Sequence, residues 1–144
     1  MKNNNTYQQL NAKVQQNKEI IITSINLAKK AIDIEDDNCN DIIKKIIEGK
    51  AISNEKKQFC KYIDSQSDDI LGLMYAIYLC GQDICLGRIF FRDQDKKQII
   101  LSCLGDFLEI NFTREGIIDK FISVRLNLFI DYMSSTLKSM KIDV

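Results

Sequence analysis

The sequence predicts an α+β fold that is mainly helical, with a small antiparallel β-meander between a central and a C-terminal helix. Two segments, 67–81 and 113–140, carry apolar residues at helical spacing behind a Ser or Thr that can cap a helix. The segment Asp83–Phe112 between them alternates loosely between apolar and polar residues, as half-buried strands do. The alternative is an all-α bundle. A helical stripe would also fit Ile100, Cys103, Leu104, Phe107 and Leu108.

The N-terminal half is expected to be helical. Leu10, Val14, Ile21 and Ile25 begin an apolar seam with spacings of 3, 4 and 7, which predicts a long helix over 6–32. The β-branched run in 19–23 would also suit a strand, and we prefer the helix. An acidic connector, Asp33–Asp37, and a short helix that ends at Gly49 should follow. Ser53 can cap the next helix, which carries Phe59, Tyr62 and Ile63.

The central helix begins at the Ser67 cap and has almost no polar face, so we expect it to be buried on most sides. Gly81 is the expected end of this helix. The last helix begins at the Thr113 cap. Arg125 falls in the middle of its apolar face, where it must pair internally, extend to the rim or contact a partner.

The meander is favoured over a helix because of Gly105. A glycine in mid-helix costs about 1 kcal/mol, whereas Gly105-Asp106 is a typical turn between strands. The expected meander has three strands, in 83–91, 98–104 and 107–112, with a polar loop at 92–97.

The composition indicates one domain over residues 1–144, with residues 1–5 frayed. Lys plus Arg and Asp plus Glu both number 20, which argues against a nucleic-acid partner. The sequence has no run of about 18 apolar residues, so no membrane span is expected. Five scattered cysteines and no export signal favour reduced thiols and a cytoplasmic location.

Catalytic and cofactor signals are absent from the sequence. The chain has no His, which removes the commonest general base and metal ligand. A calcium loop starting at Asp33 would need Gly at its sixth position and Glu at its twelfth, where the chain has Asn38 and Lys44. No phosphate-binding glycine motif or nucleophile motif occurs. We therefore expect no catalytic residue, no cofactor and no metal.

Residues 67–140 resemble the second half of the class I chaperones of type III secretion. The similar parts are an apolar helix (DDILGLMYAIYLCG), a hairpin (ICLGRIFFRDQDKKQIILSCL), a Gly-Asp turn and a long amphipathic helix (REGIIDKFISVRLNLFIDYM). Residues 6–66 depart from that family, which has a short helix followed by strands. The resemblance implies a cytoplasmic homodimer that holds an extended segment of another protein on apolar patches and has no catalytic activity.

The leading hypothesis is therefore a non-enzymatic cytoplasmic protein that binds another protein. The expected partner-binding residues lie on the meander and the terminal helix and are Arg88, Phe90, Arg125 and Phe129. The second hypothesis is an immunity or antitoxin protein that binds a toxin through Asp33–Asp37. The third is an enzyme that uses carboxylates or a thiol such as Cys85.

Overall fold

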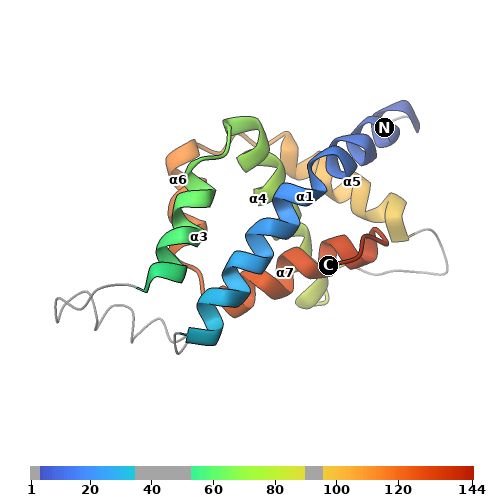
Figure 1. Ribbon diagram of the computed structural model, residues 1–144. Helices are drawn as coiled ribbons and strands as arrows, with labels where there is room; N and C mark the ends of the chain where they lie inside the picture. The colour runs from blue at the N-terminus through green and yellow to red at the C-terminus, as the bar shows by residue number, and fades with distance from the viewer. Residues whose placement is uncertain (1–3, 35–52, 90–95) are drawn as a thin grey trace.

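The structure, a computed structural model, describes residues 4–34, 53–89 and 96–144, which form six helices and no strand. The helices are α1 (Asn4–Ile34), α3 (Asn54–Asp64), α4 (Asp68–Cys85), α5 (Lys96–Leu108), α6 (Arg114–Ser123) and α7 (Leu126–Ser139). Figure 1 shows α4 among the other helices, and it contacts α1, α5, α6 and α7. The fold is all-α, so the predicted α+β class is wrong and the all-α alternative is correct.

Helix α1 follows the predicted apolar seam. It has 31 residues, and Val14, Ile21, Ile25 and Ala28 are fully buried along one side. The helix begins at Asn4 and continues through 19–23, so the strand alternative for that run is wrong. A seam of this length needs neighbours to be stable, and α1 packs on α3, α5 and α7. The connector from Glu35 onward and the short helix expected before Gly49 lie outside the described residues.

Three predicted N-caps are confirmed. The hydroxyl of Ser53 accepts a hydrogen bond from the Lys56 amide, and that of Ser67 accepts one from Ile70. Thr113 caps α6 in the same way, through the amide of Gly116 at 3.1 Å. Each cap satisfies one of the amides that the first turn of a helix leaves without a partner, so these helix starts are set locally.

Helix α4 is longer than predicted because Gly81 does not end it. The helix continues to Cys85, and the glycine with positive φ (71°) is Gly87, just beyond the C-cap Leu86. Gly81 instead lies against the backbone of α7. A Cβ at Gly81 would overlap the backbone carbonyl of Tyr132. Gly81 is therefore a packing residue, and Gly87 has the left-handed conformation expected beyond a helix end.

The predicted β-meander over Asp83–Phe112 is wrong, because no described residue of this segment lies in a strand. Its described parts are the last turn of α4, a turn at 86–89, helix α5 and the loop before α6. Ile100, Leu101 and Leu104 are buried at helical spacing, and α5 packs against α4 and α1. Gly105 lies inside α5 and is buried. Burial of the apolar stripe therefore outweighs the cost of about 1 kcal/mol for a mid-helix glycine.

The predicted C-terminal helix is broken into α6 and α7. Val124 has an extended backbone (φ −73°, ψ 151°) and ends α6, and Arg125 is the N-cap of α7. Arg125 is consequently exposed at a helix junction and does not lie in the middle of an apolar face. The break allows both helices to bury an aromatic residue, because Phe121 of α6 and Phe129 of α7 pack edge to face at 5.3 Å.

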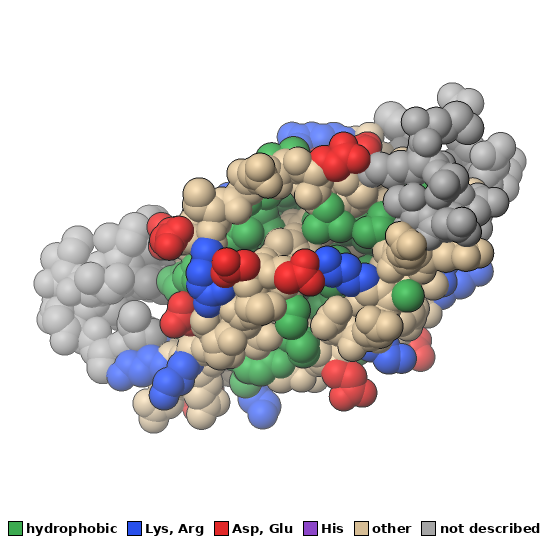
Figure 2. All heavy atoms as spheres, turned by 90° about the horizontal axis from the view of Figure 1, so that it is seen from above, with side chains coloured by type: hydrophobic (Ala, Val, Ile, Leu, Met, Phe, Trp, Pro, Cys, Tyr) green, Lys and Arg blue, Asp and Glu red, His purple; other side chains and the backbone are tan. Residues whose placement is uncertain are grey.

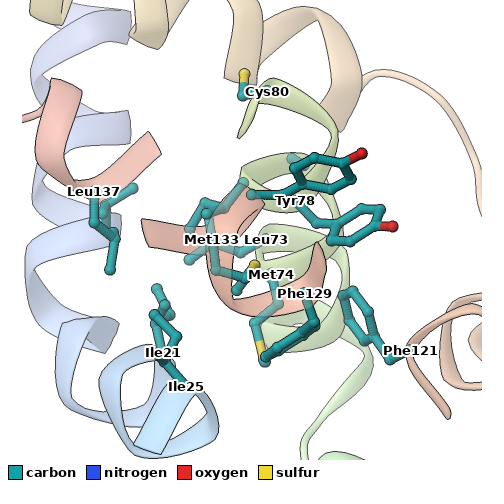
Figure 3. Packing of buried hydrophobic residues seen from close by; sticks show 14 of the residues in the cluster. Ile21, Ile25, Leu73, Met74, Tyr78, Cys80, Phe121, Phe129, Met133 and Leu137 are labelled. Carbon is teal, nitrogen blue, oxygen red and sulfur yellow. The ribbon is translucent and has the colours of Figure 1, made fainter. Parts of the chain in front are cut away.

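One cluster of buried hydrophobic side chains includes residues from all six described helices. Figure 3 shows Met133 of α7 beside Leu73 and Met74 of α4, whereas Leu137 of α7 lies next to α1, on the side of Ile21 and Ile25. The hydroxyl of Thr136 donates a buried hydrogen bond to the Ile77 carbonyl at 2.7 Å, which joins α7 to α4. None of the described helices has a stretch both long enough and apolar enough to cross a membrane.

Candidate functional site

A cleft of about 400 Å³ lies between the first turns of α4, the end of α5 and the start of α6. We call it the α4–α6 cleft. Its lining includes Asp68, Gly72, Phe107, Ile110, Phe112 and Ile117. These segments lie at the upper end of the molecule in Figure 1, and Figure 2 views the molecule from that side. The volume is within the range of about 300–1,000 Å³ that is typical of ligand pockets.

The loop between α5 and α6 supplies the exposed apolar side chains of the cleft. Ile110 is 51% exposed and Phe112 is 40% exposed, although both are large hydrophobic residues. The amide of Ile110 bonds to the carbonyl of Phe107 at 3.1 Å, and the Thr113 cap holds the other end of the loop. Exposed apolar residues that lie next to each other around a hollow typically mark a binding surface.

Phe112 is held in place by the core. Its ring meets the ring of Tyr75 edge to face, with the centroids 4.7 Å apart. The ring centroid of Tyr75 is in turn 6.0 Å from that of Tyr78 and 5.7 Å from that of Phe121. Both of these residues are fully or almost fully buried. Edge-to-face pairs of this kind contribute about 0.5–1.5 kcal/mol beyond the area they bury. The exposed ring is therefore oriented before any partner arrives.

Arg114 fixes the wall of the cleft that α6 forms. One guanidinium nitrogen donates to the carbonyl of Gln66 at 2.7 Å and to Oδ1 of Asp68 at 2.8 Å, and the other donates to the carbonyl of Asp64. These bonds join the start of α6 to the turn between α3 and α4. The planar guanidinium suits this task because its several donors point in fixed directions.

Charged side chains lie along one edge of the cleft. Asp68 and Asp69 occupy the first turn of α4, where the helix dipole favours negative charge. Asp69 pairs with Lys13 of α1 at 2.8 Å, and Asp68 pairs with Arg114. Figure 2 shows acidic and basic side chains side by side across the middle of this face, with hydrophobic side chains exposed on both sides of them.

The four residues predicted to bind a partner do not line the cleft. Arg88 lies in the turn after α4 and pairs with Asp83 at 3.3 Å. Arg125 is exposed at the start of α7, a different junction. Phe129 is fully buried and packs edge to face on Phe59 at 5.0 Å, so its side chain offers no surface in this conformation. Phe90 lies outside the described residues.

The thiols of Cys80 and Cys103 interact across the contact between α4 and α5. Figure 3 shows the sulfur of Cys80 directed away from the α4–α7 core. The hydrogen bond that Cys80 donates to Cys103, together with burial, raises the pKa of the Cys80 thiol. The same hydrogen bond lowers the pKa of Cys103, against the smaller opposing effect of burial. Cys103 is therefore the more readily ionised thiol of the pair.

Other reactive groups are less suggestive of chemistry. The sulfur of Cys85 and the hydroxyl of Ser135 are 3.2 Å apart, without a nearby imidazole because the chain has no His. Within residues 4–34, 53–89 and 96–144, no group of three or more Cys, Asp or Glu side chains is placed to hold a metal ion. The toxin-binding face predicted at Asp33–Asp37 lies outside the described side chains.

Sequence reasoning missed the residues that form the cleft. Ile110 and Phe112 lie in the segment 107–112 that is predicted to be a strand, and the sequence pattern predicts no binding role for Asp68 or Asp69. The Thr113 cap was the available signal. It places the start of a helix directly after Phe112, so Ile110 and Phe112 lie in the loop before that helix. An apolar pair in a short loop is more exposed than the same pair in a buried strand.

Comparison with known proteins identifies no similar protein. No protein-family model, no curated protein and no solved structure matches the chain.

Proposed function

We propose that this chain is a non-enzymatic protein that binds a segment of another protein in the α4–α6 cleft. The observation that carries the proposal is the exposed pair Ile110 and Phe112 on the wall of a hollow. Fully burying a large apolar side chain contributes about 1.5–3 kcal/mol, so a partner residue that covers this pair would stabilise the complex. A cleft of about 400 Å³ suits a few side chains of a short segment and not a folded domain.

The proposed setting is the cytoplasm. Among the described residues, Cys80, Cys85 and Cys103 form no disulfide, as is usual in a reducing compartment. The resemblance to secretion chaperones depended on a hairpin in 84–104, and the described parts of that segment are the end of α4, a turn and α5. The cleft is therefore the feature that supports protein binding. A secreted effector, the kind of protein that a secretion chaperone holds, is one protein that can supply the segment.

Gly72 offers a direct test of the cleft. It lines the hollow, and a Cβ at this position would meet no described atom within 4 Å. In Gly72→Leu the new side chain should fill the cleft without disturbing the core, and removing a mid-helix glycine should leave the melting temperature unchanged or higher. The matched variant Gly72→Ala adds only one methyl group and should keep the cleft open.

The probe is a phage-displayed library of random linear peptides selected on the wild-type protein. Affinities of the selected peptides are then measured by fluorescence anisotropy. Wild type and Gly72→Ala should bind, and Gly72→Leu should lose affinity by about tenfold or more, which is about 1.4 kcal/mol. The proposal is overturned if the library yields no binding peptide, or if Gly72→Leu binds as tightly as wild type.

A second pair of variants controls for general changes in surface hydrophobicity. Ile110 is 51% exposed at the cleft, and Leu86 is 53% exposed at the other end of α4. Ile110→Asp should abolish binding of the selected peptides, whereas Leu86→Asp should leave it unchanged. Equal losses in both variants would show that binding is not located in the cleft.

A further inference from the structure

The segments that build the α4–α6 cleft are strongly acidic in a chain that is neutral overall. Lys plus Arg and Asp plus Glu each number 20 in the whole sequence. Residues 64–69 and 105–119 together contain Arg114 as their one basic residue. Their acidic residues are Asp64, Asp68, Asp69, Asp106, Glu109, Glu115 and Asp119. Of these residues, Asp68 and Asp69 line the hollow, and Arg114 lines it with them. The side chains of Asp68 and Asp69 are 81% and 74% exposed, whereas that of Arg114 is 30% exposed, so most of the charge that an occupant would meet is negative. Such a surface favours an occupant of positive charge.

Arg114 lines the cleft as well, but its guanidinium is held by contacts within the wall. Its described donors point at the carbonyls of Gln66 and Asp64 and at the carboxylate of Asp68. A guanidinium used in this way stabilises the wall and partly neutralises Asp68. The most exposed charges at this edge of the cleft are therefore the carboxylates of Asp68 and Asp69.

Asp68 and Asp69 are accessible to a partner in spite of their ion pairs. Their side chains are 81% and 74% exposed, and the pairs with Arg114 and Lys13 each use Oδ1. Exposed single pairs of this kind are weak, because water screens them and both side chains lose freedom. A cation brought by a partner can therefore join these carboxylates without first breaking a strong contact.

The same charges make two other kinds of partner unfavourable. Anionic membrane surfaces attract clusters of Lys and Arg, and nucleic acids bind basic surfaces through their phosphates. The exposed carboxylates of Asp68 and Asp69 repel both kinds of partner. The exposed apolar pair next to these carboxylates is matched instead by a polypeptide that carries apolar and basic side chains together.

We infer that the partner segment is basic, with an apolar side chain against Ile110 and Phe112 and an adjacent Lys or Arg that contacts Asp68 and Asp69. This inference rests on the proposed function of the cleft and adds the chemistry of its occupant. The apolar side chain supplies the buried area. The basic residue sets the orientation of the segment and excludes acidic competitors.

The peptides selected from the random library test the inference. Lys and Arg should be enriched next to an apolar residue, and Asp and Glu should be depleted. Replacing the enriched basic residue of a selected peptide by Gln should weaken its binding to wild type. Raising the salt concentration should weaken binding too, because an exposed contact between opposite charges is screened.

The double variant Asp68→Asn/Asp69→Asn identifies the protein side of the contact. Its affinity for the basic peptides should fall by about tenfold and lose most of its salt dependence. Asp131→Asn/Asp143→Asn removes two exposed carboxylates elsewhere and should bind like wild type. Melting temperatures of both variants show whether a loss of binding reflects a loss of folding.

The outcomes separate the two proposals. If peptides bind and Gly72→Leu blocks them, but they are not basic and Asp68→Asn/Asp69→Asn has no effect, the inference is overturned and the proposed function stands. If no peptide is selected, both are overturned. If the wild-type chain is dimeric and Ile110→Asp makes it monomeric, the occupant is a second copy of this chain, and the basic segment is overturned.

Discussion

Gly81 of α4 lies directly against the backbone carbonyl of Tyr132 in α7, at a distance that leaves no room for a Cβ atom. Close to this contact, Thr136 of α7 donates its buried hydrogen bond to the carbonyl of Ile77. The two helices are therefore joined by backbone approach and by a specific polar bond. Small residues at such crossings cannot be enlarged without moving a whole helix.

Gly81→Ala should therefore be strongly destabilising. The added methyl group meets backbone atoms, which cannot turn away as a flexible side chain could. Overpacking of this kind costs about 1–3 kcal/mol or more, and chemical denaturation would measure it. Gly72→Ala is the control, since open space surrounds that position within the described residues. Similar stability of Gly81→Ala and wild type would show that α4 and α7 are further apart than described.

The stability of the protein should fall between pH 10 and pH 12 through Tyr78. Burial, with the neighbouring Tyr132 and Tyr75, raises the pKa of Tyr78 from its ordinary value of 10.0 to about 12. Below pH 10 the hydroxyl is protonated in both the folded and the unfolded state. Between these values the unfolded chain ionises and the folded chain does not, which lowers the free energy of unfolding.

Denaturation curves at several alkaline pH values measure this effect. Tyr78→Phe cannot ionise, so its free energy of unfolding should fall less steeply over that range than that of wild type. Tyr62→Phe is the matched control, because it makes the same substitution at a tyrosine on α3. An equal slope in wild type and Tyr78→Phe would contradict the prediction.

Cys103 should react with iodoacetamide at a lower pH than an ordinary thiol. The hydrogen bond from Cys80 lowers the pKa of Cys103, and the thiolate is the reactive form. Mass spectrometry of alkylated protein across a pH series gives the midpoint for each cysteine. In Cys80→Ala the donor is lost, so the midpoint for Cys103 should rise, whereas Cys80→Ser keeps a donor and should change it less. An unchanged midpoint in Cys80→Ala would rule out this hydrogen bond as the cause.

Arg125→Ser should stabilise the protein. Arg125 occupies the N-cap of α7 and makes no cap hydrogen bond through its side chain to the described residues. A Ser hydroxyl there can accept a bond from an amide of the first turn, which contributes about 0.5–2 kcal/mol. Thermal denaturation should show a higher melting temperature than for Arg125→Ala. A lower one would mean that the Arg125 side chain stabilises the junction in another way.

The sequence predicted what is decided locally. Ser53, Ser67 and Thr113 were identified as caps because a short polar side chain before an apolar periodic segment satisfies amides of its own helix. The apolar seam of α1 was recognised for a similar reason, since its period is visible without knowledge of any neighbour. Both kinds of signal depend on residues a few positions apart.

The errors arose where tertiary packing decided the outcome. Gly105 signalled a turn, but α5 passes through it because Ile100, Leu101 and Leu104 are buried against other helices. Gly81 signalled a helix end, but a glycine is needed there because the backbone of Tyr132, 51 positions later, leaves no room for a Cβ atom. The break at Val124 has no Gly or Pro to announce it. Its consequence is that Arg125 and Phe129, predicted as one surface, have opposite environments.

Tyr75 gives the molecule a built-in optical reporter. Its ring touches Phe112 on one side and the aromatic core residues Tyr78 and Phe121 on the other. The chain has no Trp and only five Tyr, so tyrosine dominates the near-ultraviolet spectrum. A change in the orientation of Phe112 alters the asymmetric surroundings of Tyr75, and near-ultraviolet circular dichroism can follow it without any attached dye.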